Sequence, residues 1–315
     1  MPQRYILAVL AIFAIAYCLT NRPAPAQRGL VAQQCVTCRG RCFLGRCFCD
    51  NPTCSRDDAT CDDDTCWFSE ANGVTIVSPD RWARAQQGEG EHWTASKADT
   101  NDGWESHGAD FALYAPLNGR DLGHFVEIGC GPFTQTTFMR SKIPDARFSS
   151  ITLVDPLIYK YLQHVDNCNY KDGMLDKTAV TLISAPSEQL RFRHEFDTLL
   201  TVNVLEHVRD AFAHLELVYN ALKPGGILVF HERWWNTYVP SQEKAANYKQ
   251  WLYHPVRVRK PVIDHFLSKF ARRIRECQKT PGEGEGRSSL SWTRTFAKRM
   301  MKELCAFGVA RRPWW

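Results

Sequence analysis

Five short apolar runs, separated by amphipathic stretches, lie between residues 125 and 230 of this 315-residue chain. The runs cover residues 125–128, 151–154, 179–183, 196–202 and 227–230. Short runs of this kind that alternate with helical segments predict βαβ units, and therefore an α/β fold with a parallel sheet. Ligands of such sheets bind at the carboxyl ends of the strands, so the residues directly after each run are the candidates for a binding site.

The composition allows one sizeable domain with small additions. Hydrophobic residues make up 44% of the chain and charged residues 23%, which suffices for a packed core and excludes a disordered chain. The formal net charge of +5 is mild, so we expect no nucleic-acid partner bound through overall charge. Residues 233–315 hold 18 Lys and Arg against 6 Asp and Glu, an excess that suits either a solvated basic face or an acidic glycan or phosphorylated partner.

The first residues have the pattern of a secretory targeting segment. Residues 5–19 are fifteen consecutive apolar residues that follow Arg4, and residues 21–34 form a polar linker. A membrane-spanning helix needs roughly 17 to 25 apolar residues, so two interpretations of residues 1–20 stay open: an uncleaved signal anchor, or a signal peptide cleaved near Ala24-Pro25-Ala26. The anchor predicts a single-pass membrane protein of the Golgi or endoplasmic reticulum lumen, whereas cleavage predicts a secreted protein.

Eight of the 13 cysteines lie in residues 35–66, which we interpret as a small disulfide-rich module. The segment has almost no aliphatic residues, so it cannot bury enough apolar area to fold without cross-links. Disulfides supply them in an oxidising lumen, and a zinc cluster is the alternative in a cytosolic protein. Residues 42–49 resemble the middle of an EGF-like module, with its glycine turn and Cys-x-Cys pair. Residues 67–117 show poor periodicity and are interpreted as a covering segment with one short helix near residues 110–117.

Three motifs and one aspartate lie directly beside the ends of the apolar runs. Residues 127–132 read Glu-Ile-Gly-Cys-Gly-Pro after the first run, and glycines there permit close approach of a ligand to a helix N-terminus. The second run ends in Asp155, 26 residues after Gly129, where a carboxylate can accept both hydroxyls of a ribose. Residues 204–208 read Val-Leu-Glu-His-Val after the fourth run, and Leu-Lys-Pro-Gly-Gly at residues 222–226 precedes the fifth.

With these motifs in this order, residues 125–230 resemble the class I S-adenosylmethionine-dependent methyltransferases of the type 11-like branch. The resemblance implies a Rossmann-like methyltransferase sheet of seven strands with flanking helices, here residues 118–270, and S-adenosyl-L-methionine as cofactor. The residues that it implies for cofactor binding are Glu127, Gly129 and Gly131 at the methionine end, Asp155 at the ribose, Glu188 near the adenine and Asn203 at the end of the fourth strand. A dinucleotide-binding oxidoreductase is the nearest rival, but its fuller glycine fingerprint is absent.

Methyl transfer to a hydroxyl needs an aligned acceptor and usually a base. His231 and Glu232, directly after the fifth run, are catalytic candidates, and the two tryptophans that follow them can stack on a sugar ring. His254 is a second candidate base, in a Tyr-His-Pro-Val-Arg segment that resembles an element of related methyltransferase-like proteins. His207 is interpreted as structural, and no metal site is predicted.

The sequence therefore predicts an S-adenosylmethionine-dependent methyltransferase of the secretory pathway that O-methylates a glycan hydroxyl. Two alternatives stay open: methylation of a protein or small molecule, and a non-catalytic binding protein that retains the fold. The second is motivated by Phe133, which stands where the family has a third glycine, and by Ser184-Ala185-Pro186 in the adenine loop. No closing β-hairpin of the family can be recognised in residues 271–315, so either that hairpin is distorted or these residues are a basic C-terminal extension outside the family core.

Overall fold

The computed structural model describes residues 42–44, 46–47, 68–69, 73–75, 77–95, 110–235, 248–270, 272–278 and 306–311. The predicted targeting segment at residues 1–20 and the linker at residues 21–34 lie outside the described residues, as does most of the predicted disulfide-rich module at residues 35–66. No described helix is long and apolar enough to cross a membrane.

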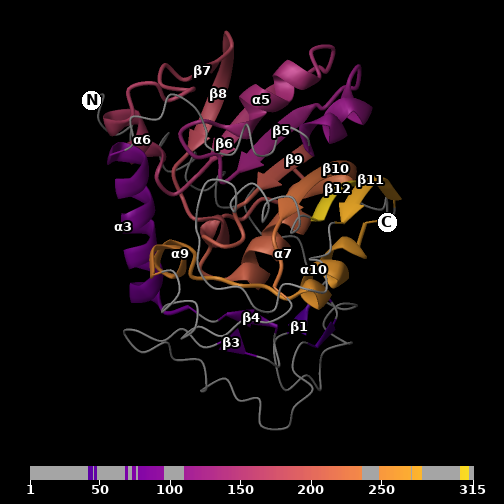
Figure 1. Ribbon diagram of the computed structural model, residues 1–315. Helices are drawn as coiled ribbons and strands as arrows, with labels where there is room; N and C mark the ends of the chain where they lie inside the picture. The colour runs from indigo at the N-terminus through magenta and orange to yellow at the C-terminus, as the bar shows by residue number, and fades with distance from the viewer. Residues whose placement is uncertain are drawn as a thin grey trace, which may run out of the picture.

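A central sheet of eight strands dominates the described part of the chain, in the order β11-β12-β10-β9-β5-β6-β8-β7 (Figure 1). The five predicted apolar runs all form strands of this sheet: β5 (His124–Ile128), β6 (Ser150–Val154), β8 (Thr178–Ile183), β9 (Phe196–Val202) and β10 (Leu222–Glu232). These five strands pair in parallel, which confirms the α/β prediction.

Antiparallel strands complete both edges. The short β7 (Met174–Leu175) pairs with β8 at one edge. At the other edge, β12 (Ala306–Arg311) pairs with β10, and β11 (Arg272–Gln278) pairs with β12. The sheet therefore has eight strands where the resemblance implied seven, and a domain boundary at residue 270 is too early because residues beyond it supply two strands.

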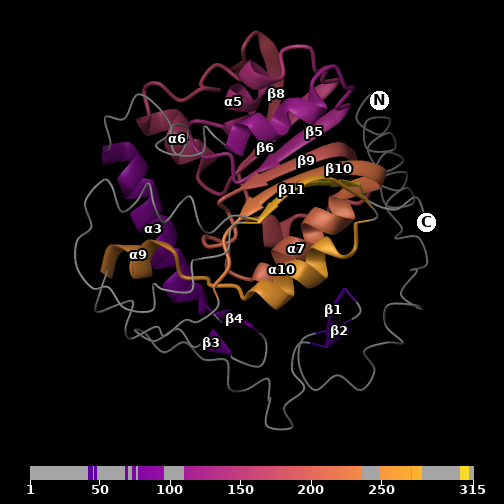
Figure 2. The same cartoon turned by 45° about the vertical axis from the view of Figure 1, so that its right-hand side comes forward.

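Helices cover both faces of the sheet (Figure 2). One apolar cluster joins α7 (Ala211–Ala221) and α10 (Lys260–Leu267) to the face that carries Val126, Leu199 and Leu228. The other cluster joins α5 (Gln135–Lys142) and α6 (Ile158–His164) to the face that carries Phe125, Leu200 and Val229. Adjacent residues of a strand thus belong to opposite cores, as the two-residue period of a strand requires.

The described parts of residues 67–117 contain more regular structure than the sequence indicated. The predicted short helix is present as the 3-10 helix η2 (Asp110–Leu117). The 17-residue helix α3 (Pro79–Ala95), however, was not predicted. It begins where the Ser78 hydroxyl accepts a hydrogen bond from the Arg81 amide at 3.1 Å, and it crosses the carboxyl-end side of the sheet (Figure 1).

Small strand pairs lie outside the main sheet. These are β1 (Cys42–Phe43) with β2 (Arg46–Cys47), and β3 (Phe68–Ser69) with β4 (Val74–Thr75). The Phe43 ring is buried and lies 5.0 Å from the ring of Phe212 on α7. The Nε2 atom of His265 on α10 is 3.1 Å from the carbonyl oxygen of Phe43. These two contacts attach the β1–β2 turn to the sheet-covering helices.

Candidate functional site

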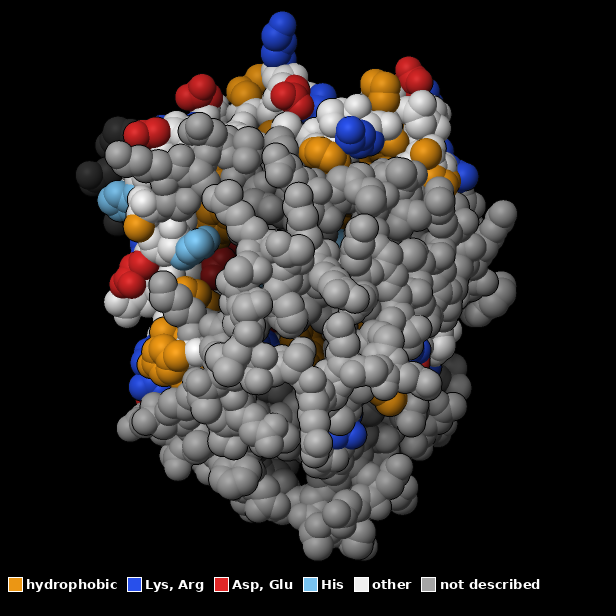
Figure 3. All heavy atoms as spheres, in the orientation of Figure 1, with side chains coloured by type: hydrophobic (Ala, Val, Ile, Leu, Met, Phe, Trp, Pro, Cys, Tyr) orange, Lys and Arg blue, Asp and Glu red, His pale blue; other side chains and the backbone are white. Residues whose placement is uncertain are grey.

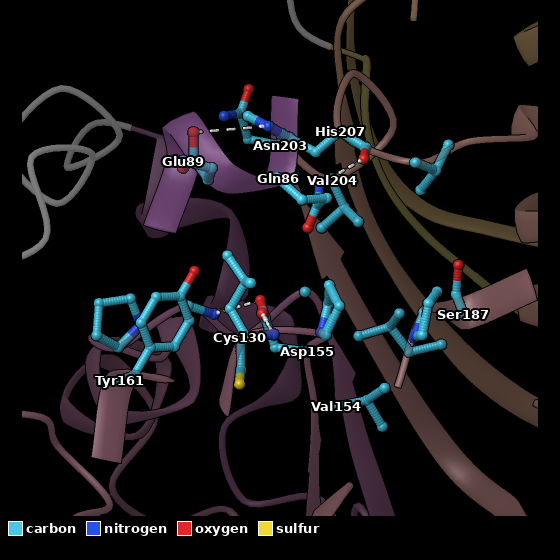
Figure 4. A pocket seen from close by; sticks show the side chains of 18 of the residues that line it. Gln86, Glu89, Cys130, Val154, Asp155, Tyr161, Ser187, Asn203, Val204 and His207 are labelled. Carbon is cyan, nitrogen blue, oxygen red and sulfur yellow. Dashed lines mark hydrogen bonds and ion pairs between the residues drawn. The ribbon is translucent and has the colours of Figure 1, made fainter. Parts of the chain in front are cut away.

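A cavity lies at the carboxyl ends of β5, β6, β8 and β9, which is the edge predicted for ligand binding. Its walls come from the turns after these strands, at residues 128–133, 154–157, 185–188 and 202–208, and from one face of α3 (Figure 4). Helix α3 therefore closes the side that the sheet leaves open.

The glycine turn after β5 gives the cavity its floor. Gly129 has a φ of +77°, and a Cβ there would lie 2.2 Å from Cγ2 of Val204, so only glycine fits. Gly131 has a φ of +55°, but no atom lies within 4 Å of where its Cβ would be. The backbone at Gly131 therefore borders open space that a ligand can enter.

Glu127 does not line this cavity, although it was predicted to bind the cofactor. Its buried carboxylate accepts hydrogen bonds from the amides of Gln135 and Thr136, at 2.9 and 3.0 Å, and from the hydroxyls of Thr134 and Thr136. Burial raises the pKa of Glu127 to about 7 against these hydrogen bonds. Glu127 thus joins the glycine turn to the start of α5 on the side away from the cavity.

Asp155 lines the cavity at the end of β6, as predicted. One carboxylate oxygen accepts from the Gly131 amide at 3.1 Å, and the other accepts from the Leu157 amide at 2.8 Å. Each oxygen keeps a second lone pair, so the oriented carboxylate can still accept from a ligand hydroxyl. Burial raises its pKa to about 6.

The loop after β8 is fixed to helix α7. Glu188 lines the cavity, but its Oε1 accepts from the amides of Arg209 and Asp210 at 2.6 and 3.0 Å. The neighbouring Ser187 hydroxyl is 2.9 Å from Nδ1 of the buried His214, whose pKa burial lowers to about 4. Glu188 therefore borders the predicted adenine region mainly as an anchor of the loop.

His231 and Glu232, which were predicted as catalytic bases, lie inside β10, and neither residue lines the cavity. The Glu232 carboxylate accepts hydrogen bonds from the backbone amides of Val204 and Leu205, both at 3.0 Å. Burial raises the pKa of Glu232 to about 7. The structure thus places Glu232 as a support of the turn after β9. Asn203 belongs to that turn and lines the cavity. Its backbone amide donates a hydrogen bond to the His231 carbonyl at 2.9 Å.

His254, the other predicted base, lies one layer behind the cavity wall. Its ring centroid is 4.5 Å from that of His207, and burial lowers its pKa to about 3. The neighbouring Glu206 is buried with Arg233 and Arg257, whose Nη1 atoms are 3.4 and 3.6 Å from its carboxylate. Burial raises the pKa of Glu206, but these guanidinium groups and His254 outweigh it and hold the pKa below its usual value.

The sequence analysis missed one whole wall of the cavity. Trp82, Gln86, Glu89 and Trp93 of α3 line it, at spacings of four, three and four residues that place them on one helical face. His207, interpreted as structural, lines it too, with its Nδ1 3.9 Å from Oε2 of Glu89 (Figure 4). The Ser-Pro-Asp sequence at residues 78–80 is a helix-start signal that would have located α3.

The charges on the cavity wall are negative. Among the described residues that line it, Glu89, Asp155 and Glu188 are carboxylates, and none is a lysine or arginine. The described part of the chain also contains no group of three or more His, Cys, Asp or Glu side chains placed to hold a metal ion.

Comparison with known proteins agrees with this architecture. Residues 126–230 match a family model described as a methyltransferase domain. The predicted enzyme class and its cofactor, S-adenosyl-L-methionine, are thereby confirmed.

Solved structures provide more distant similarities. The N-methyltransferase NodS from Bradyrhizobium japonicum WM9, in complex with S-adenosyl-L-homocysteine, is 15% identical, and the match covers 73% of this chain and 99% of that one with a TM-score of 0.47. The 1,6-didemethyltoxoflavin-N1-methyltransferase of Burkholderia thailandensis is 18% identical, with 76% and 92% covered and a TM-score of 0.44. No curated protein sequence matches the chain.

The cavity of the methyltransferase domain fits this cofactor at two places. The open space beside Gly131 allows the backbone to approach a ligand, and the Asp155 carboxylate has free lone pairs for a ribose diol. When bound, the cofactor supplies an electrophilic methyl group on a sulfonium. The residues predicted for its binding divide into Gly129, Gly131, Asp155, Glu188 and Asn203 on the wall and Glu127 behind it.

Proposed function

We propose that this methyltransferase transfers the methyl group to a hydroxyl of a neutral glycan or small molecule in the secretory pathway. The observation that carries the proposal is the single cavity that joins the Gly131 and Asp155 end to a second end walled by Trp82, Glu89 and His207. The second end offers an aromatic surface and polar groups to an acceptor. Indole rings stack well on the apolar faces of sugars and other rings.

A neutral acceptor fits the wall better than an acidic one. An anion would enter a cavity that has three carboxylates and, among its described wall residues, no lysine or arginine. No described residue of the basic segment, residues 233–315, lines the cavity.

The non-catalytic alternative loses its main motivation. Phe133 is buried, and its ring lies 5.8 Å from that of Trp93 in an edge-on contact. The bulky residue in the glycine loop thus packs against α3 and leaves the space beside Gly131 open. Methylation of a protein or another small molecule remains the alternative acceptor within the same chemistry.

The compartment rests on the sequence. The apolar run at residues 5–19 and the eight cysteines of residues 35–66 support a secretory protein, held in the Golgi or endoplasmic reticulum membrane if the run is retained and secreted if it is cleaved. Expression of the full chain, followed by N-terminal sequencing and non-reducing mass spectrometry of residues 35–66, tests both features. Free thiols with bound zinc would contradict the secretory assignment.

The acceptor is tested by incubation of the full-length protein with methyl-labelled cofactor and a secreted glycan pool from its own source, with Asp155→Ala as the inactive control. Label in released monosaccharides is the expected result. Label only in protein or lipid would reject the glycan and support the alternative acceptor. No label from a broad panel, together with no binding of S-adenosylhomocysteine, would reject methyl transfer itself.

A further inference from the structure

The contact between Glu89 and His207 joins two parts of the cavity wall that are far apart in the chain. Glu89 belongs to α3, and His207 belongs to the turn between β9 and α7. Figure 4 shows the pair beside Asn203 and Gln86, on the side of the cavity away from Asp155 and Tyr161. The pair is therefore remote from the residues that fit the ribose.

The position of His207 is fixed from several directions. Its carbonyl accepts from Nε1 of Trp82 at 2.9 Å and from Nε2 of Gln86 at 3.1 Å. Its amide donates to the Val204 carbonyl at 2.8 Å, and its ring packs on the ring of His254. A side chain fixed in this way is oriented before any ligand arrives.

Glu89 is oriented as well. Its Oε1 accepts from Nε1 of Trp93 at 2.7 Å, which leaves Oε2 towards Nδ1 of His207 at 3.9 Å. Both side chains are about one fifth exposed, at 19% for Glu89 and 18% for His207. At 3.9 Å the Glu89 carboxylate is close enough to Nδ1 for a charge interaction but beyond hydrogen-bond distance, so both ring nitrogens remain without a hydrogen bond to the described residues.

We propose that the Glu89–His207 pair forms the acceptor end of the cavity, where Nε2 of His207 takes the proton of the acceptor hydroxyl and Glu89 holds the imidazole. This inference rests on the proposed function and names its base, in place of His231, Glu232 and His254. His207 is the catalytic residue of the pair, and Glu89 is a positioning residue. The arrangement of a carboxylate, an imidazole and a hydroxyl follows the logic of known acyl-transfer triads.

The step balances in atoms and charge. The acceptor oxygen forms a bond to the methyl carbon while the carbon–sulfur bond breaks and its electron pair stays on sulfur. The hydroxyl proton moves to Nε2 of His207, so one positive charge leaves the sulfonium and one appears on the imidazole. Glu89 stabilises that imidazolium, which is a reason for a carboxylate at this position.

The other ionisable groups around His207 do not replace it. His254 packs on its ring and stays neutral at physiological pH, since burial lowers its pKa to about 3. Glu206, next to it in the chain, is paired with Arg233 and Arg257. Asp155, across the cavity, interacts with His207 only through longer-range charge. Glu89 is thus the carboxylate that contacts the imidazole.

The test compares two ligands that differ only where the methyl group is transferred. S-adenosylhomocysteine has a bare sulfur there, whereas sinefungin carries an ammonium-bearing carbon. We expect Glu89→Gln and His207→Asn to keep the affinity for S-adenosylhomocysteine and to weaken sinefungin about tenfold, through loss of a charge-assisted contact. Calorimetry on the full chain measures both.

Glu91→Gln and His164→Asn are the matched controls, since both residues are exposed, on α3 and α6. An unchanged ratio of the two affinities in both Glu89→Gln and His207→Asn overturns the inference while leaving methyl transfer intact. Wild-type protein that binds neither ligand overturns both. Thermal unfolding checks the fold, and Glu89→Gln carries the test alone if His207→Asn is unfolded.

Discussion

Buried carboxylates hold the turns of this site together. Glu127, Asp155 and Glu232 each lie at or near the carboxyl end of a strand and accept hydrogen bonds from backbone amides of a neighbouring turn or helix start, and burial raises the pKa of each to between about 6 and 7. Only Asp155 also faces the cavity. At the scale of single residues, the sequence thus indicates correctly where acidic side chains gather but not which of them meets a ligand, since that depends on which oxygen lone pairs the backbone has already taken.

Replacement of Asp155 by Asn should weaken binding of S-adenosylhomocysteine by about 1 to 3 kcal/mol, because charged hydrogen bonds to the ribose are lost. Its pKa of about 6 adds a pH dependence. Protonation removes an acceptor, so the wild-type affinity should decline as the pH falls below about 6, and the decline should be smaller in Asp155→Asn. Calorimetry at several pH values measures this, with the exposed Asp166→Asn as control. An unaltered affinity in Asp155→Asn would contradict the ribose assignment.

The raised pKa of Glu127 predicts how the free energy of unfolding depends on pH. Its pKa is about 7 in the folded protein, against an ordinary value of 4.5, so the folded state binds the proton more tightly. The stability that this group contributes is complete below about pH 4.5 and is lost as the pH rises through about 7, by at most about 1.4 kcal/mol per pH unit. The free energy of unfolding should therefore depend less on pH in Glu127→Gln than in the wild type. The exposed Glu91→Gln should keep the wild-type slope in urea denaturation, and an equal slope in Glu127→Gln would refute the prediction.

The helices and strands that could be predicted from the sequence are those with a clear hydrophobic pattern. The five parallel strands could be located from the sequence because each carries a compact apolar run between amphipathic stretches. Helix α3 has a start signal at residues 78–80 but could not be located by hydrophobic pattern, because its buried face has no apolar stripe: its buried residues are Arg81, Ala85, Gln86, Gly88 and Gly90. The Arg81 guanidinium donates to the Leu252 carbonyl at 2.7 Å and lies over the Trp251 ring. Polar and small residues thus attach this helix to α9 (Tyr248–Tyr253), and this kind of packing leaves no periodic signal.

The two glycines of α3 predict opposite effects on substitution. A Cβ at Gly88 would lie 2.2 Å from the Tyr253 ring, so Gly88→Ala should destabilise the protein by about 1 to 3 kcal/mol and loosen the wall that α3 forms. A Cβ at Gly90 would meet the end of the flexible Lys160 side chain, which can move away. Gly90→Ala should therefore be neutral or stabilise by up to about 1 kcal/mol, through helix propensity. Chemical denaturation of the pair decides, and equal effects at both positions would show that α3 does not pack on α9 as described.

At the scale of the whole molecule, pairing with the last strand determines how far the fifth apolar run extends as a strand. The run was expected to end at residue 230 and to release His231 and Glu232 towards a ligand. Strand β10 instead continues to Glu232, because β9 pairs with it as far as His231 and β12 pairs with it as far as Glu232. Strands β11 and β12 are separated by residues 279–305, so no compact hairpin was visible in the sequence. The location of His231 and Glu232 inside β10 and the extension of the sheet beyond residue 270 therefore have one cause.

A truncation tests this view of the C-terminal residues. A chain that ends at Phe270 loses β11 and β12, so the whole register from Ile227 to Glu232 on β10 becomes an unpaired edge. Exposed edges of this length pair with other chains, so the truncated protein should aggregate or lose several kcal/mol of stability. A chain that ends at Arg311 retains both strands and should match the full-length protein in size-exclusion chromatography and in urea denaturation. A monomeric, fully stable protein that ends at Phe270 would show that residues 271–315 are the separable basic extension suggested by their composition.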